Sequence, residues 1–143
     1  MKQNINLISL KTSDFQFDIN RISEILELTP TYFFRKGDKF LYGGKKIEKI
    51  RQINYWEYCL EIHSNDWVQV LFNDFIETII LPRKEFLVEL SKTCNIEIAI
   101  SIHYYDGVTP SFHFDSKSFK ILQEFNAELD IDIYVLENHT SSS

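Results

Sequence analysis

The chain has 143 residues, of which 44% are hydrophobic and 15% aromatic, and its formal net charge at pH 7 is −6. A chain of this length buries about 68–70% of its unfolded surface, so the composition predicts one globular domain and argues against disorder. No apolar run approaches the roughly 20 residues of a membrane-spanning helix. The N-terminus does not resemble a secretory signal, which predicts a cytoplasmic protein without a membrane partner.

The charge is unevenly distributed along the chain. Residues 35–51 (RKGDKFLYGGKKIEKIR) contain seven basic and two acidic side chains, a local charge of +5, so the remaining residues carry −11. An acidic protein repels nucleic acid and attracts basic proteins, although a basic segment acts locally within about 8 Å. The sequence therefore predicts a protein partner and disfavours a nucleic acid.

The first elements follow from hydrophobic spacing. Alternation predicts a strand over residues 5–11. Asp18 is the predicted N-cap of a helix whose apolar residues recur every three or four positions, and Thr29-Pro30 ends that helix. Gly37-Asp38 and Gly43-Gly44 mark two turns, so residues 39–42 and 45–50 predict an exposed hairpin. Strict alternation from residue 56 to residue 63 predicts the second long strand.

The remaining elements are two helices, a long strand, a returning strand, a helix and a final strand. Ser64-Asn65-Asp66 starts the first helix, and Pro82 interrupts it and opens the second. The β-branched alternation over residues 96–105 predicts the long strand, and residues 112–114 are expected to return beside it. Asp115-Ser116 caps the next helix, and alternation over residues 129–135 predicts the last strand.

The resulting order is β-α-β-α-α-β-β-α-β. It predicts an α+β fold in which helices pack on one face of a mainly antiparallel sheet, as in ferredoxin-like folds and their relatives. The other face of this sheet is expected to be polar. Residues 1–137 are predicted to form a single domain, followed by a polar C-terminal tail over residues 138–143.

Three segments resemble a known family. They are Leu28-Thr29-Pro30-Thr31 running into Arg35-Lys36-Gly37-Asp38, Trp56 at the start of a strand, and Asp130-Ile131-Asp132-Ile133-Tyr134 near the end. The chain resembles the bacterial domain-of-unknown-function family DUF4279 over nearly its whole length. The resemblance implies a stand-alone bacterial α+β domain without an established activity. Small bacterial domains of this class often serve as immunity proteins or other protein-binding partners.

One set of residues has the chemistry of a metal site. If residues 112–114 pair with the preceding strand, His103 faces His113 on the polar side of the sheet, and Asp130 and Asp132 project from the same side. Two imidazoles and a carboxylate suit Zn²⁺ or a similar ion, which would allow a metal-dependent enzyme. The alternative is an ordinary solvated strand face, which explains the same residues without a metal.

The sequence contains no recognisable catalytic motif. GxSxG, HExxH and the P-loop pattern are all missing, so no catalytic residue and no cofactor is predicted. Whether the chain is an enzyme stays open, and a non-catalytic role is favoured. Cys59 and Cys94 stand alone, without a CxxC pair, and are predicted to be reduced structural thiols.

The basic segment is the most distinctive candidate surface. Its candidate binding residues are Arg35, Lys36, Asp38, Lys39, Tyr42, Lys45 and Lys46. Aromatic side chains between cations could stack on bases while the cations neutralise phosphates, which would make residues 32–51 a nucleic-acid site. The simpler alternative is that the aromatic residues anchor a loop while its lysines and arginines are solvated.

Charge, size and the missing motifs together favour a non-catalytic protein-binding domain. An immunity-type protein that neutralises a basic toxin is its specific form, since an acidic body steers basic partners. Nucleic-acid binding through residues 32–51 is the alternative hypothesis. The sequence predicts no oligomeric state.

Overall fold

The computed structural model describes residues 2–44, 47–105, 107 and 111–137. The predicted tail over residues 138–143 lies outside the described residues, as do Lys45 and Lys46. The strands are β1 (Ile5–Ser13), β2 (Tyr32–Phe34), β3 (Lys39–Tyr42), β4 (Ile47–Ile50), β5 (Tyr55–His63), β6 (Asn95–Tyr104) and β7 (Glu128–Val135). The helical elements are α1 (Ile19–Leu26), α2 (Val68–Phe75), a π-helical turn (Ile76–Ile80), a 3₁₀ turn (Leu81–Arg83), α3 (Lys84–Leu90) and α4 (Ser116–Glu124).

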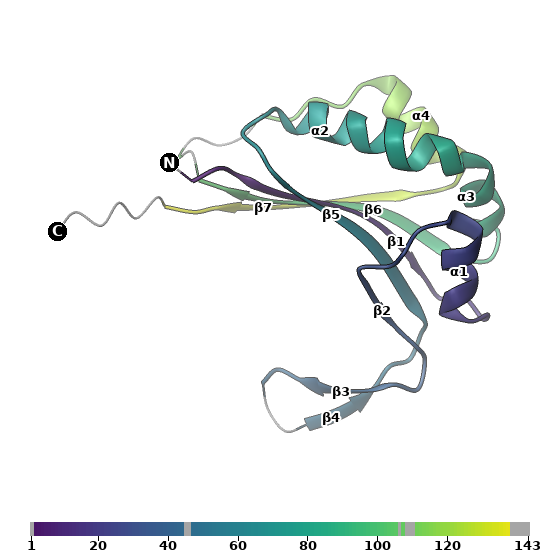
Figure 1. Ribbon diagram of the computed structural model, residues 1–143. Coiled ribbons are helices and arrows are strands. Elements are labelled where there is room, and N and C mark those ends of the chain that lie inside the picture. The colour runs from purple at the N-terminus through teal and green to yellow at the C-terminus, as the bar shows by residue number, and fades with distance from the viewer. Residues whose placement is uncertain (1, 45–46, 106, 108–110, 138–143) are drawn as a thin grey trace.

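Five strands form one mixed sheet in the order β2-β5-β1-β6-β7 (Figure 1). The central strand β1 pairs antiparallel with both β5 and β6, while β7 lies parallel to β6. The helices cover one face of this sheet and leave the other face uncovered. The predicted α+β class with a mainly antiparallel sheet is confirmed, whereas the predicted relation to ferredoxin-like folds stays a prediction.

The predicted order of elements lacks the short strand β2 and contains one strand that does not form. Residues 112–114 form no strand, and α4 connects β6 directly to a parallel β7. The alternation of Phe112 and Phe114 that suggested a strand reflects packing against the helices, since the Phe114 ring lies edge-on to Phe72 with centroids 5.1 Å apart. A parallel pair requires such a crossover, because a tight turn joins antiparallel strands only.

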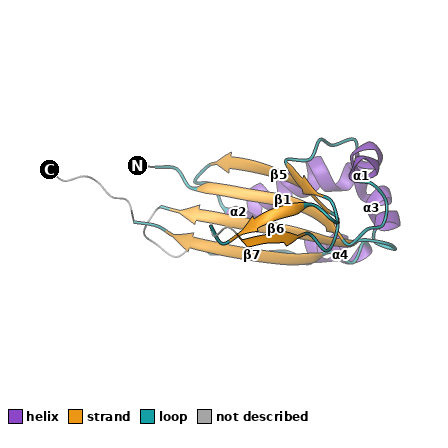
Figure 2. Ribbon diagram, turned by 90° about the horizontal axis from the view of Figure 1, so that it is seen from below, coloured by secondary structure: helices purple, strands orange, loops and turns teal. Residues whose placement is uncertain are grey.

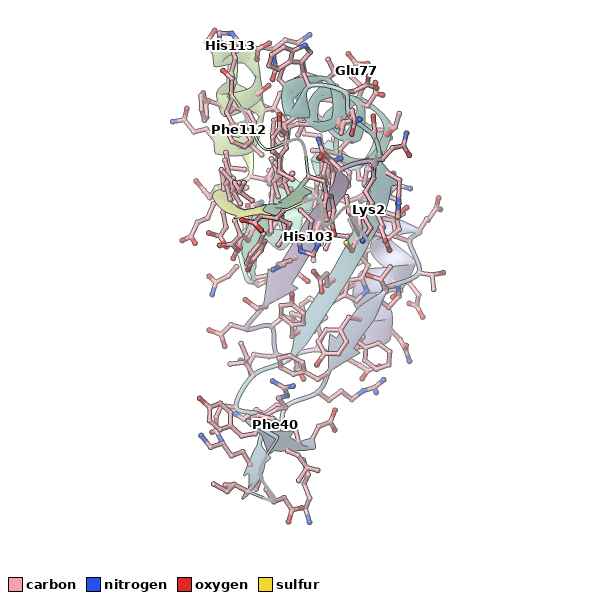
Figure 3. The ribbon with its side chains drawn as sticks, turned by 90° about the vertical axis from the view of Figure 1, so that its left-hand side faces the viewer. Lys2, Phe40, Glu77, His103, Phe112 and His113 are labelled. Atoms are coloured by element: carbon pink, nitrogen blue, oxygen red, sulfur yellow. The ribbon has the colours of Figure 1, made fainter. Side chains whose placement is uncertain are left out.

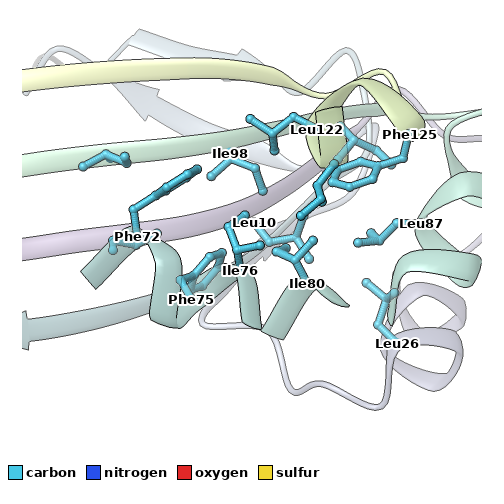
Figure 4. Packing of buried hydrophobic residues seen from close by; sticks show 14 of the residues in the cluster. Leu10, Leu26, Phe72, Phe75, Ile76, Ile80, Leu87, Ile98, Leu122 and Phe125 are labelled. Atoms are coloured by element: carbon cyan, nitrogen blue, oxygen red, sulfur yellow. The ribbon is translucent and has the colours of Figure 1, made fainter. Parts of the chain in front are cut away.

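The core lies between the sheet and the helical layer (Figure 4). Alternate residues of β1 and β6 point into it, so Ile8, Leu10, Ile98 and Ile100 are almost fully buried. Burying apolar side chains from both layers supplies the main stabilisation, at about 25 cal/mol per Å² removed from water. Trp56 of β5 is also completely buried.

The predicted helix boundary near Pro82 is confirmed with a refinement. A π-helical turn and a 3₁₀ turn connect α2 to α3, so the backbone stays helical from Val68 to Leu90. Arg83 stabilises this junction, because its guanidinium donates to the carbonyl of Leu26 at 2.7 Å and to that of Ile79 at 3.1 Å. Among the described residues, no helix has the length and apolar character needed to cross a membrane.

The predicted hairpin exists and stands apart from the sheet. Strands β3 and β4 pair with each other in a separate two-stranded sheet. This hairpin lies on the side of the sheet opposite the helices, and the view from below places it in front of the sheet (Figure 2). We refer to residues 35–51 as the hairpin arm, and to the sheet face turned away from the helices as the open face.

Candidate functional site

The open face follows from the strand register. Side chains directly opposite one another across a strand pair point to the same face, and they alternate along each strand. Ser9 of β1 pairs with Cys59 of β5 and Ala99 of β6, and Ala99 pairs with Asp130 of β7. By this register, the carboxylates of the open face are Glu57, Glu61, Glu97, Glu128, Asp130 and Asp132.

One row of charged side chains crosses four strands of the open face. Lys11 of β1 pairs with Glu57 on one side and Glu97 on the other, and Glu97 pairs with Glu128. The Lys11 Nζ lies 4.0 Å from Glu57 Oε1. Lys11 is the single lysine or arginine that the described strands place on this face. The open face is therefore strongly acidic.

Glu97 experiences this acidity most directly. Partial burial raises the pKa of the Glu97 carboxyl, Lys11 opposes the change, and Asp130, Glu128 and Asp132 add to it. A hollow of about 200 Å³ lies beside the row and is lined by Lys11, Tyr55, Glu97 and Glu128 among others. Since the carboxylates of Glu97 and of its neighbours on β7 repel one another, a bound cationic group would relieve this repulsion.

Aromatic side chains border the acidic region where β2 joins the sheet. The rings of Phe34 and Tyr55 stack with centroids 5.0 Å apart, and Tyr32 lies edge-on to both. Burial, followed by the charge of Glu57, raises the pKa of the Tyr55 phenol, which therefore stays protonated at neutral pH. Arg51 donates to the Tyr32 hydroxyl at 3.1 Å and connects this border to the hairpin arm.

The structure does not bring the two predicted metal-binding histidines together. His103 lies on the open face, where it packs edge-on against Tyr134 with centroids 5.2 Å apart. His113 precedes α4 on the helix side of the sheet, because the expected returning strand does not form (Figure 3). Asp130 and Asp132 do share the open face with His103. No group of three or more potential metal ligands occurs among the described residues.

The predicted residues of the hairpin arm mostly serve its own structure. Arg35 donates to Asp18 Oδ1 at 3.0 Å, and the Lys39 ammonium lies 3.4 Å from Glu48. Asp38 accepts a hydrogen bond from the Arg35 backbone N–H at 2.8 Å, which closes the first turn of the arm. The backbone N–H of Lys36 donates to Asn54, while the Lys36 side chain is exposed.

Cations also cover aromatic rings of the arm and of the adjoining strand β2. Lys49 Nζ lies 3.9 Å from the centre of the Tyr42 ring, and the Arg51 guanidinium lies 3.8 Å from that of Phe40 and 4.0 Å from that of Phe34. These cation–π contacts occupy ring faces on which a base would otherwise stack. The arrangement weakens the case for nucleic-acid binding.

A second concave surface lies between α1 and α3. This groove has a volume of about 880 Å³, an apolar floor and a charged rim. Its apolar lining residues are Phe17, Ile25, Phe86 and Leu90, and its charged ones are Asp18, Arg21, Glu24, Glu27 and Glu89. The described lining contains no histidine or cysteine. The groove, like the open face, is lined by more acidic than basic side chains.

Both cysteines are free, as predicted. Burial raises the pKa of the Cys59 thiol and that of the Cys94 thiol, which disfavours the reactive thiolate. Neither thiol therefore has the environment of an activated nucleophile.

Sequence reasoning missed Glu97 as the centre of a candidate surface. Its acidic neighbours Glu128, Asp130 and Asp132 lie about thirty positions later, on a strand whose parallel pairing the sequence did not predict. The available signal was the alternation of acids with apolar residues in β7 and the position of Glu97 between two isoleucines of β6, which becomes informative once the two strands are known to be adjacent.

A search of curated proteins and a search of solved structures each found no match. One protein family matches, and its model covers residues 3–136, nearly the whole chain. The family resemblance seen in the sequence is thereby confirmed. The chain belongs to DUF4279, a family described as a domain of unknown function.

Proposed function

We propose that this chain is a non-catalytic protein-binding domain that captures a basic partner on its open face. The observation that supports this proposal is the open face itself, on which six carboxylates accompany a single lysine. A sheet face that helices leave uncovered and that carries mainly negative charge is a surface that a basic protein can bind. Its field steers such a partner and raises the association rate more than the affinity.

Neutralisation of a basic toxin by an immunity-type protein is the specific form of this proposal. A toxin that acts on nucleic acid presents cations to phosphate, and an acidic surface competes for the same cations. The aromatic border around Tyr32 and Phe34 adds apolar area next to the charged row, and such rings contribute strongly to protein interfaces.

The test compares two variants with the same change of charge. Asp130→Lys/Asp132→Lys reverses two exposed carboxylates on the open face, while Asp74→Lys/Glu77→Lys reverses two exposed carboxylates on the helical layer. Wild-type and variant chains are used to capture proteins from the source organism, and each captured protein is then purified and titrated. We expect saturable binding to the wild type and to the helical-layer variant, and loss of binding in the open-face variant.

Equal capture by the open-face variant and the wild type would contradict the proposal. Nucleic-acid binding through residues 32–51 is the alternative, and it makes a different prediction. In that case labelled single-stranded DNA or RNA binds the wild type, its affinity falls steeply with salt, and Lys36→Glu/Lys49→Glu abolishes binding.

A further inference from the structure

The hairpin arm exposes apolar side chains that the rest of the described chain leaves uncovered. Leu41 is 71% exposed, Tyr42 57%, Ile47 52% and Ile50 53%. An isolated two-stranded hairpin is only marginally stable in water, because it has no layer on which to bury such residues. Since β3 and β4 pair only with each other among the described strands, the arm has the properties of an element that is completed by another surface.

The arm and the open face have opposite charges. The arm carries seven basic and two acidic residues, whereas the open face combines its six carboxylates with one lysine. The aromatic border of Tyr32, Phe34 and Tyr55 lies beside these carboxylates, with Arg51 of the same chain over the Phe34 ring. The chain therefore contains both halves of a complementary interface, an exposed basic hairpin and an acidic sheet face.

The base of the arm is held by hydrogen bonds, and its Arg51 side chain contacts Tyr32 and Phe34 at the edge of the open face. The backbone N–H of Gly37 donates to the carbonyl of Arg51 at 2.8 Å, and that of Arg51 donates to Asp38 at 2.8 Å. Asn54 accepts from the backbone N–H of Lys36 at 2.8 Å and donates to the carbonyl of Phe15 at 2.8 Å, which ties the arm to the end of β1. The arm lies on the open-face side of its own sheet (Figures 1 and 2), yet β3 and β4 pair with no strand of that sheet.

We propose that the hairpin arm of one copy docks on the open face of a second copy, and that the exchange is reciprocal. A two-fold dimer then contains two identical contacts, each joining a basic arm to an acidic face. The inference rests on the proposed function in that it uses the same face, and it names a second copy as an occupant of that face. A foreign basic partner would compete with the arm for the open face.

The test measures the mass of the full chain by sedimentation at several protein and salt concentrations. The arm variant Lys36→Glu/Lys49→Glu and the face variant Asp130→Lys/Asp132→Lys each place like charges across both contacts. We expect a wild-type dimer that dissociates as salt rises, and each variant alone should dimerise about tenfold more weakly or worse. The helical-layer variant Asp74→Lys/Glu77→Lys is the matched control and should dimerise like the wild type.

Mixing the two variants provides the decisive measurement. The basic arm of the face variant meets the unaltered acidic face of the arm variant, and the two introduced glutamates of the latter meet the two introduced lysines of the former. A mixture should therefore form a heterodimer that neither variant forms as a homodimer. A wild type that stays monomeric at low salt, or a dimer that both variants leave intact, would overturn the inference. If the wild type is monomeric while the face variant loses a captured partner, the proposed function stands without the dimer.

Discussion

Arg35 Nε donates a hydrogen bond to Asp18 Oδ1 at 3.0 Å, so the base of the hairpin arm is attached to the N-terminus of α1. The other oxygen of the same carboxylate, Oδ2, accepts from the backbone N–H of Asn20 at 3.2 Å and caps the helix. One side chain therefore performs two tasks, a helix cap and an anchor for the arm. The Arg35 guanidinium also lies 5.3 Å from the centre of the Phe33 ring.

Two substitutions at Asp18 separate these tasks. Asparagine is as good an N-cap as aspartate but lacks the charge that pairs with Arg35, whereas alanine removes both interactions. We expect Asp18→Ala to lower the melting temperature at pH 7 by more than Asp18→Asn does. Equal melting temperatures for the two variants would show that the cap contributes nothing measurable. Thermal unfolding followed by circular dichroism provides the comparison.

The contribution of Asp18 also depends on pH. The hydrogen bond from Arg35, followed by that from Asn20, holds the pKa of Asp18 below its ordinary value. The folded state therefore binds this proton less readily than the unfolded state does, and the contribution is complete above the unfolded pKa. It is lost as the pH falls through the folded pKa. The melting temperatures of wild type and Asp18→Asn should converge in strong acid.

Ionisation of Glu97 should affect the stability of the fold in the opposite sense to ionisation of Asp18. Burial raises the pKa of its carboxyl, and the acids of β7 add to this effect, so ionised Glu97 costs stability at neutral pH. We expect Glu97→Gln to stabilise the fold at pH 7 by less than about 1 kcal/mol, because solvent still screens this partly buried side chain. The difference should vanish below the ordinary pKa of glutamate, where Glu97 is neutral in both states. Urea unfolding at pH 7 and in acid provides the measurement, and a less stable variant at pH 7 would contradict the prediction.

The long strands and the helix caps were predictable because their signals are local. Alternation placed the strands that became β1, β5, β6 and β7, and the carboxylates of Asp18 and Asp115 cap α1 and α4 as expected. The short strand β2 has three residues, too few to show alternation, and its position depends on a distant contact. The backbone N–H of Thr31 donates to the carbonyl of Glu57 at 2.8 Å, 26 positions away.

The candidate site depended on strand adjacency, which is not a local property. Phe112 and His113 read as a continuation of the alternating pattern, although their backbone leads into α4. That single misplaced segment paired His103 with His113 in the predicted site. The same reasoning missed Asn6, which is buried on the core side of β1 and donates to the carbonyls of Ile62 and Ser64, each at 3.1 Å.

Trp56 and Ser23 supply a test of the packing between β5 and α1. The indole N–H of Trp56 donates to the Ser23 hydroxyl at 3.0 Å, and the tryptophan is completely buried. Ser23→Ala leaves this buried donor without its partner, which should cost about 1–3 kcal/mol. Ser13→Ala, on the open face, is the matched control and should change the free energy of unfolding by less than about 0.5 kcal/mol. Chemical denaturation measures both, and equal effects would show that the indole finds another acceptor.

The last prediction concerns the dynamics of the hairpin arm. Because β3 and β4 lack a covering layer among the described residues, their backbone hydrogen bonds should open locally without unfolding of the sheet. In dilute protein at high salt, we expect the amides of Lys39–Tyr42 to exchange with solvent much faster than those of Ile96–Ile102 in β6. Raising the protein concentration at low salt should slow exchange in the arm and leave β6 unchanged, since the β6 backbone is already hydrogen-bonded to β1 and β7. Lys36→Glu/Lys49→Glu should remove this concentration dependence. Arm amides that exchange as slowly as those of β6 in dilute protein would show that the hairpin is stable without a partner surface.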